Sequence, residues 1–213
     1  MPSPRRLGLK TSATRTALIE AATQLIREEG HKALSSRRVA EKAGLKPQLV
    51  HYYFRTIDDL AIAVLQRSGD EVLKRAARSV TSAEPMRALW ELATDMKAAL
   101  FTIEVVAMAS HHEAIREEAI RYGAQYRTIT AEAIARYLEL RGIAPGLSPM
   151  AVTMIITAVG GMLMREKALG MSVGHQELEN LIEAWLAAFT TKDKPASPSR
   201  PRAQARRRSK NSR

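Results

Sequence analysis

The stretch from Ser35 to Leu65, SSRRVAEKAGLKPQLVHYYFRTIDDLAIAVL, decides the fold of the N-terminal part of this chain. The hydroxyl of Ser35 or Ser36 can cap a short helix, because a side-chain oxygen accepts from the free N–H groups of the first turn. Gly44 predicts the end of that helix, since glycine enters left-handed backbone without a steric penalty. Pro47 predicts the start of a second helix, because its fixed φ suits the first turn. Two short helices joined by a glycine turn indicate a helix-turn-helix.

The second helix divides into a face for the core and a face for a partner. Leu49, Val50 and Phe54 can point inward, which leaves amide, imidazole, phenol and cationic groups outside. Such a face fits the DNA major groove, where glutamine pairs with adenine and lysine reaches guanine or phosphate. The residues expected at DNA are Ser36, Arg37, Lys46, Gln48, His51, Tyr52, Tyr53 and Arg55.

Residues from Ala13 to Leu65 resemble the DNA-binding domain of the tetracycline-repressor (TetR) family of transcriptional regulators. The matching segments are Gly30-His31, then SSRRVAEKAGL at 35–45, then VHYYFRTIDDL at 50–60, in the family's order and spacing. His31 and His51 stand where the family usually has aromatic residues. Ile57 replaces a lysine that contacts a DNA phosphate in the family, and the nearby Arg55 could supply that charge instead.

The resemblance implies an all-α fold, with an N-terminal three-helix helix-turn-helix domain and a C-terminal helical domain for ligand binding and dimerisation. We expect a flexible basic arm at 1–12, the helix-turn-helix at 13–57 (the reader domain), a helical effector-binding and dimerisation domain at 58–190 (the body) and a disordered basic tail at 191–213. Thr56 can cap a long helix that links reader domain to body, with Asp58 and Asp59 in its first turn. No segment of the body alternates like a strand.

The net charge of +11 lies where a polyanion would bind. Residues 1–15 carry +4 and residues 191–213 carry +8, while the stretch between them sums to −1. Within that stretch, residues 31–55 carry a local charge of +5. Basic segments on a nearly neutral body are typical of a DNA-binding protein. Charge alone would also fit a non-specific architectural DNA binder, which is the alternative to a sequence-specific regulator.

The same sequence argues against an enzyme, a membrane protein or a secreted protein. Cysteine is absent, and no phosphate-binding glycine loop or nucleophile motif occurs, so neither catalysis nor a cofactor is expected. No charge-free run of about eighteen apolar residues predicts a membrane span. An apolar secretory segment is also missing from the N-terminus. The expected location is the cytoplasm, in association with the nucleoid.

In the body we expect helices at roughly 84–97, 98–109, 112–141, 149–169 and 175–190, with breaks at 142–146 and 170–174. The helix at 149–169 is apolar on nearly every side, which fits either a central helix or one shared between subunits. A helix-turn-helix protein that reads a palindromic operator needs two copies, so we expect a homodimer through residues 149–190. Gly160 and Gly161 would let helices approach closely at that interface.

Aromatic and thioether side chains of the body could line an adaptable pocket for a small, largely apolar effector, although such residues are often plain core. The pocket candidates are Trp90, Phe101, Met108, His111, Tyr122, Tyr126, Met154 and Met162. The pair His111-His112 lacks the spacing that brings two imidazoles to one ion, so no metal site is expected. The resemblance implies that effector binding releases the operator, which would make the protein a repressor.

Overall fold

The computed structural model describes residues 12–79, 81–142, 146 and 148–190, and every regular element among them is helical. In chain order the elements are α1 (Ala13–Glu29), the short 3-10 helix η1 (His31–Ala33), α2 (Ser36–Lys42), α3 (Pro47–Tyr53), α4 (Ile57–Ser79), α5 (Pro85–Ala93), α6 (Met96–Ala109), α7 (Glu113–Arg141), α8 (Pro149–Ala168) and α9 (His175–Thr190). The predicted all-α fold is confirmed. Apart from Ser12, the expected basic arm and basic tail lie outside the described residues.

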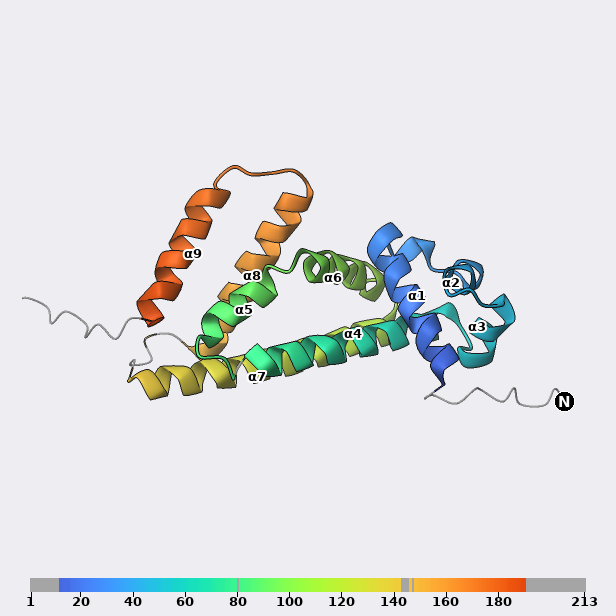
Figure 1. Ribbon diagram of the computed structural model, residues 1–213, viewed down its shortest axis with the longest axis horizontal. Coiled ribbons are helices and arrows are strands. Elements are labelled where there is room, and N and C mark those ends of the chain that lie inside the picture. The colour runs from blue at the N-terminus through green and yellow to red at the C-terminus, as the bar shows by residue number, and fades with distance from the viewer. Residues whose placement is uncertain (1–11, 80, 143–145, 147, 191–213) are drawn as a thin grey trace, which may run out of the picture.

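The helices form an elongated molecule with the helix-turn-helix at one end (Figure 1). Helices α1 to α3 make up that end, while α8 and α9 stand at the other. The long helices α4 and α7 lie side by side between the two ends and connect them. No helix in the described part of the chain is both long enough and apolar enough to cross a bilayer.

Local capping signals in the reader domain operate as predicted. Ser35 caps α2 by accepting a hydrogen bond from the Arg38 backbone N–H at 3.4 Å. Gly44 takes a left-handed φ of +65° between α2 and α3, where a Cβ would be strained. At the start of α4, Thr56 and Asp59 exchange side-chain and backbone hydrogen bonds of 3.0 and 3.1 Å, a reciprocal cap.

The boundary between α5 and α6 lies earlier than the predicted break between residues 97 and 98. Helix α5 ends at Ala93, and α6 begins at Met96. The cause is Asp95, whose carboxylate accepts from the backbone N–H groups of Lys97 at 3.0 Å and Ala98 at 3.2 Å. These bonds satisfy free donors at the start of a helix, and they outweigh the continuous apolar pattern across the segment.

Two buried clusters hold the fold together, and the boundary between them does not coincide with residue 57. The first cluster contains buried residues of all the helices from α1 through α4. It also contains Phe101, Val105 and Met108 of α6 and Ile115 of α7. The second joins α5, α7, α8 and α9 around residues such as Ile134 and Ile156. Because α6 contributes to the first cluster, the reader domain packs directly on the body and is not connected to it through α4 alone.

Two glycines allow helices of the body to touch within the same chain. A Cβ on Gly69 of α4 would lie 2.5 Å from a ring carbon of Tyr122 on α7. A Cβ on Gly160 of α8 would lie 2.8 Å from the Cβ of Ala93 on α5. The expectation that Gly160 serves the contact between subunits is therefore wrong, because its missing side chain accommodates α5. At Gly161 a Cβ would meet nothing within 4 Å, so this glycine remains on an open face.

Candidate nucleic-acid interface and junction cavity

Helix α3 presents a polar face to solvent and an apolar face to the core. Val50 and Phe54 are 1% and 3% exposed, which confirms the predicted inward face, while Leu49 is half-buried. The predicted outward residues are all exposed: Lys46, Gln48, His51, Tyr52 and Arg55. Because α3 has only seven residues, its position depends on the buried side chains of Val50 and Phe54 and on the turn at Gly44 that precedes the helix. The exposed groups have the size and chemistry to enter a major groove.

The cations of α2 divide into two kinds. Arg38 and Lys42 are engaged by α1, because the Arg38 guanidinium lies 2.6 Å from the Glu29 carboxylate and the Lys42 ammonium pairs with Glu28. The hydrogen bond from Lys42 is the largest cause that holds the pKa of Glu28 below its usual value. Arg37 is exposed and has no carboxylate partner among the described residues, so its charge is available to a phosphate.

Ser36, Tyr53 and Arg55 of this surface differ in how accessible they are to a DNA partner. Ser36 is half-buried in the first turn of α2. The hydroxyl of Tyr53 lies 2.8 Å from that of Ser12 at the start of α1, and its ring meets that of Tyr52 edge-on at 4.9 Å. Arg55 is exposed just before α4, whereas Ile57 packs against the first buried cluster.

The eight predicted pocket residues are distributed over both buried clusters and the surface of the described structure. Trp90 belongs to the second buried cluster, whereas Phe101 and Met108 belong to the first. His111 is exposed at the turn between α6 and α7, and Met154 is 47% exposed on α8. The remaining three are Tyr122, which is buried, and Tyr126 and Met162, which are half-buried.

Among these eight residues, the two tyrosines of α7 have a pKa that is raised above the ordinary value. The Tyr122 hydroxyl donates to the Asp70 carboxylate at 2.8 Å, and burial together with that carboxylate raises the pKa of Tyr122. Burial also raises the pKa of Tyr126. Both phenols therefore stay protonated near neutral pH, and the Tyr122 hydroxyl is a hydrogen-bond donor to Asp70.

Two histidines of this region pair with carboxylates. His112 lies 3.4 Å from Asp58 at the start of α4, and His31 lies 2.6 Å from Glu104 of α6. No group of three or more His, Cys, Asp or Glu suited to a metal occurs among the residues that the structure describes. Both pairs link the reader-domain side of the molecule to α6 and α7, which sequence patterns did not predict.

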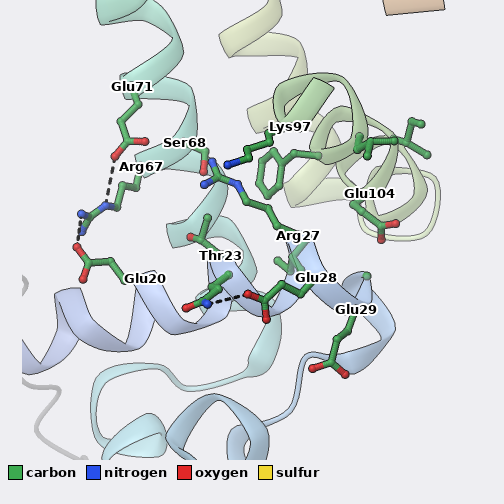
Figure 2. Close-up of a pocket in the computed structure, with 16 residues that line it drawn as sticks. Glu20, Thr23, Arg27, Glu28, Glu29, Arg67, Ser68, Glu71, Lys97 and Glu104 are labelled. Atoms are coloured by element: carbon green, nitrogen blue, oxygen red, sulfur yellow. Dashed lines mark hydrogen bonds and ion pairs between the residues drawn. The ribbon is translucent and has the colours of Figure 1, made fainter. Parts of the chain in front are cut away.

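A cavity of about 810 Å³ lies where α1, α4 and α6 meet, and we call it the junction cavity (Figure 2). Only one of the predicted pocket residues, Phe101, lines it. The full lining comprises Glu20, Thr23, Gln24, Ile26, Arg27, Glu28, Glu29, Gly30, Arg67, Ser68, Glu71, Lys97, Leu100, Phe101, Ile103 and Glu104. Three segments far apart in sequence build this cavity, so no local motif predicts it.

Comparison with known proteins places the reader domain in a family. Residues 18–64 match the family model described as "Bacterial regulatory proteins, tetR family". This segment includes the buried face of α1, both helices of the helix-turn-helix and the first part of α4. The chain is also 31% identical over 113 residues to the HTH-type transcriptional regulator BetI of Rhizobium meliloti (strain 1021). That match covers 50% of this chain and only 55% of the relative.

Solved structures share the fold over most of the chain. One is a proposed transcriptional regulator from Saccharomonospora viridis in complex with choline, with a TM-score of 0.68 at 21% identity, covering 79% of this chain and 95% of that one. Another is a TetR transcription regulator from Haloarcula marismortui, with a TM-score of 0.65 at 18% identity, covering 82% and 96%. At these identities the likeness concerns the fold.

Proposed function

We propose that the chain is a member of the TetR family of bacterial regulatory proteins, whose model matches residues 18–64, and that it is a sequence-specific, DNA-binding transcriptional regulator. The observation that carries the proposal is the exposed face of α3. It combines Gln48, Lys46 and His51 on a helix whose opposite side is locked into the core by Val50 and Phe54. A protein that only attracted phosphate would not need an amide on a rigid, projecting helix.

In this proposal the exposed groups divide the work of binding. Gln48, in the first turn of α3, pairs bidentately with adenine, and Lys46 reaches guanine or phosphate. Arg37 and Arg55 supply phosphate contacts, and Arg55 takes over the role that Ile57 lacks. Ser36, His51, Tyr52 and Tyr53 add hydrogen bonds to the DNA backbone. The basic segments at 1–12 and 191–213 add non-specific attraction.

We further propose a homodimer through residues 149–190 that binds a palindromic operator. Supporting it, α8 and α9 expose large apolar side chains in the single chain: Met150, Met154, Ile155 and Leu181. Leu181 is 65% exposed although its neighbour Ile182 is 7% exposed in the second buried cluster. A second copy would cover that surface, with Gly161 on the same open side of α8 permitting close approach.

We propose that the protein represses transcription in the cytoplasm, in association with the nucleoid. A small, largely apolar effector would release it from its operator. The choline complex of the structural neighbour supports a small-molecule effector in this fold. Within this chain, the hydroxyl of Thr153 on α8 is buried and has no hydrogen-bond partner among the described residues. An unsatisfied buried hydroxyl costs about 1–3 kcal/mol, which a ligand with one polar atom could offset.

The test compares two single substitutions against a panel of operator variants and random duplex. Gln48→Ala should relax base preference by about 1–3 kcal/mol at one position, because it removes a bidentate base contact. Arg55→Ala should weaken binding to every duplex alike, since a phosphate contact carries no sequence information. If the Gln48 variant keeps the wild-type ranking of operators, the assignment of α3 is wrong. A wild-type protein that binds random duplex as tightly as any selected site would instead be an architectural binder.

A further inference from the structure

The junction cavity has a chemical character that the proposed function does not use. Its walls come from α1 of the reader domain and from α4 and α6 of the body (Figure 2). Five carboxylates and three cations line it, which alone would suggest an acidic site. The partners of these charges decide which of them a ligand could engage.

Each carboxylate of the lining already has a basic side chain as its partner. Glu20 and Glu71 both pair with Arg67, as the dashed lines in Figure 2 mark. Glu104 pairs with His31, whose backbone N–H also donates to it at 2.7 Å. The other two pair with cations of α2: Glu28 with Lys42, and Glu29 with Arg38. Each acidic group of the cavity therefore already has a basic partner within the protein, although Glu20 and Glu71 share one guanidinium.

Two cations of the lining have no such partner. Neither Arg27 nor Lys97 forms an ion pair with any carboxylate among the residues that the structure describes. Their charged ends point toward the same part of the cavity, next to Ser68 of α4 (Figure 2). Like charges that converge repel each other, and an anion between them would remove that repulsion. The two charged groups of the lining that form no ion pair among the described residues are thus both cations.

The surroundings of these cations favour an organic anion over a bare ion. The Arg27 guanidinium lies over the Phe101 ring, 5.6 Å from its centroid. Next to that ring, Leu100 and Ile103 are 39% and 41% exposed, so apolar surface remains available at the cavity. Ser68 is 7% exposed, and the described part of the chain supplies no hydrogen-bond partner for its hydroxyl.

We propose that the junction cavity is a binding site for a small organic carboxylate that carries an apolar group. Arg27 and Lys97 hold the carboxylate from two sides, and the Ser68 hydroxyl donates to it. The apolar group of the ligand lies on Phe101 and the neighbouring side chains of α6. Such a ligand would bridge reader domain and body. The consequence that it alters DNA binding rests on the proposed function, whereas the site itself does not.

Benzoate is a suitable probe, and benzamide is its neutral match. Binding is measured by calorimetry and by the side-chain nitrogen resonances of arginine and lysine, on the full chain without DNA. Benzoate should bind at millimolar concentration and shift one arginine and one lysine signal, which Arg27→Met and Lys97→Met identify. Each substitution should weaken benzoate roughly five- to tenfold, because it removes one charge-assisted contact at a partly exposed site.

Lys74→Met is the matched control, because Lys74 is an exposed lysine of α4 that does not line the cavity. It should leave benzoate binding unchanged. Lys97→Glu places a carboxylate opposite Arg27 and should abolish benzoate binding while the thermal transition stays intact. Inorganic phosphate, which lacks an apolar group, should bind more weakly than benzoate.

Three results would overturn the proposal. They are benzoate affinity unchanged in both cavity variants, benzamide binding as tightly as benzoate, and phosphate binding as tightly as benzoate. A second titration with operator DNA present tests the consequence separately. If benzoate binds as predicted but leaves operator affinity unchanged, the site stands and its link to DNA binding is refuted. If the protein binds no DNA, the proposed function fails while the benzoate result still decides the site.

Discussion

The close approach of α4 to α7 makes Gly69→Ala an informative perturbation. A Cβ at this position would lie 2.5 to 2.6 Å from three ring carbons of Tyr122. The ring is held in place, because its hydroxyl donates to Asp70 at 2.8 Å and the Arg121 guanidinium lies 4.1 Å from its centroid. Either the helices separate or the ring moves and gives up the hydrogen bond to Asp70.

The magnitude follows from three contributions. Overpacking where two helices lie this close costs about 1–3 kcal/mol. Loss of the Tyr122 hydrogen bond costs about 1 kcal/mol more, while alanine in a helix interior gains about 1 kcal/mol over glycine. The free energy of unfolding should therefore fall by about 2 kcal/mol, which lowers Tm by roughly 4–8 °C for a chain of this size.

Urea and thermal unfolding of Gly69→Ala and Gly123→Ala measure the effect. Gly123 is the matched control, because it follows Tyr122 on α7 and a Cβ there would meet nothing within 4 Å. Its substitution should raise stability by up to about 1 kcal/mol through helix propensity alone. Equal effects of the two substitutions would refute the argument that the Tyr122 ring lies directly on α4.

Four further predictions concern two glycines of α8, the link between reader domain and body, and the tail. Gly160→Ala should destabilise the fold by about 1–2 kcal/mol, because its Cβ would meet Ala93 at 2.8 Å. Gly161→Ala, with open space around it, should keep stability but weaken the dimer in sedimentation, and an unchanged dimer would exclude Gly161 from the interface. Burial raises the pKa of Glu104, but the hydrogen bonds from His31 outweigh it and hold the pKa below the ordinary 4.5. The stabilisation is therefore present above that value and lost as pH falls through the lowered pKa, so wild type and Glu104→Gln should differ most in urea unfolding near neutral pH and converge in acid. A difference that persists in acid would show that the ion pair is not its source. Removing residues 192–213 should flatten the slope of log K against log salt by about 0.9 for each phosphate that the tail neutralises, while operator choice is kept; an unchanged slope would mean that the tail does not touch DNA.

The reader domain could be predicted from sequence because its signals are local. Ser35, Gly44, Pro47 and Thr56 each act on their own helix end through backbone geometry or capping bonds, and the structure has them in those roles. The inward and outward faces of α3 follow from helical periodicity within seven residues. Asp95 is a local capping signal too, but the continuous apolar pattern around it conceals the break.

Features that depend on which helices meet could not be predicted in this way. Gly160 and Gly161 are neighbours in sequence, yet only the packing of α5 shows that one is covered and the other open. The pocket candidates rest on residue type alone, and the fold distributes them over both buried clusters and the surface. The junction cavity needs residues of α1, α4 and α6 together, and its two cations without an ion pair are recognised only when each carboxylate is matched to its partner.

Selection of bound sequences from a random duplex library tests the central claim, sequence-specific DNA binding, most directly. Wild type should enrich a palindromic motif whose half-sites lie about one helical turn or a multiple of it apart, because each subunit of the proposed dimer places α3 in a major groove. In the Gln48→Ala selection the same half-site spacing should persist, with preference lost at one adenine position of each half-site. Random sequences recovered by the wild-type protein, with no motif above background, would contradict the account.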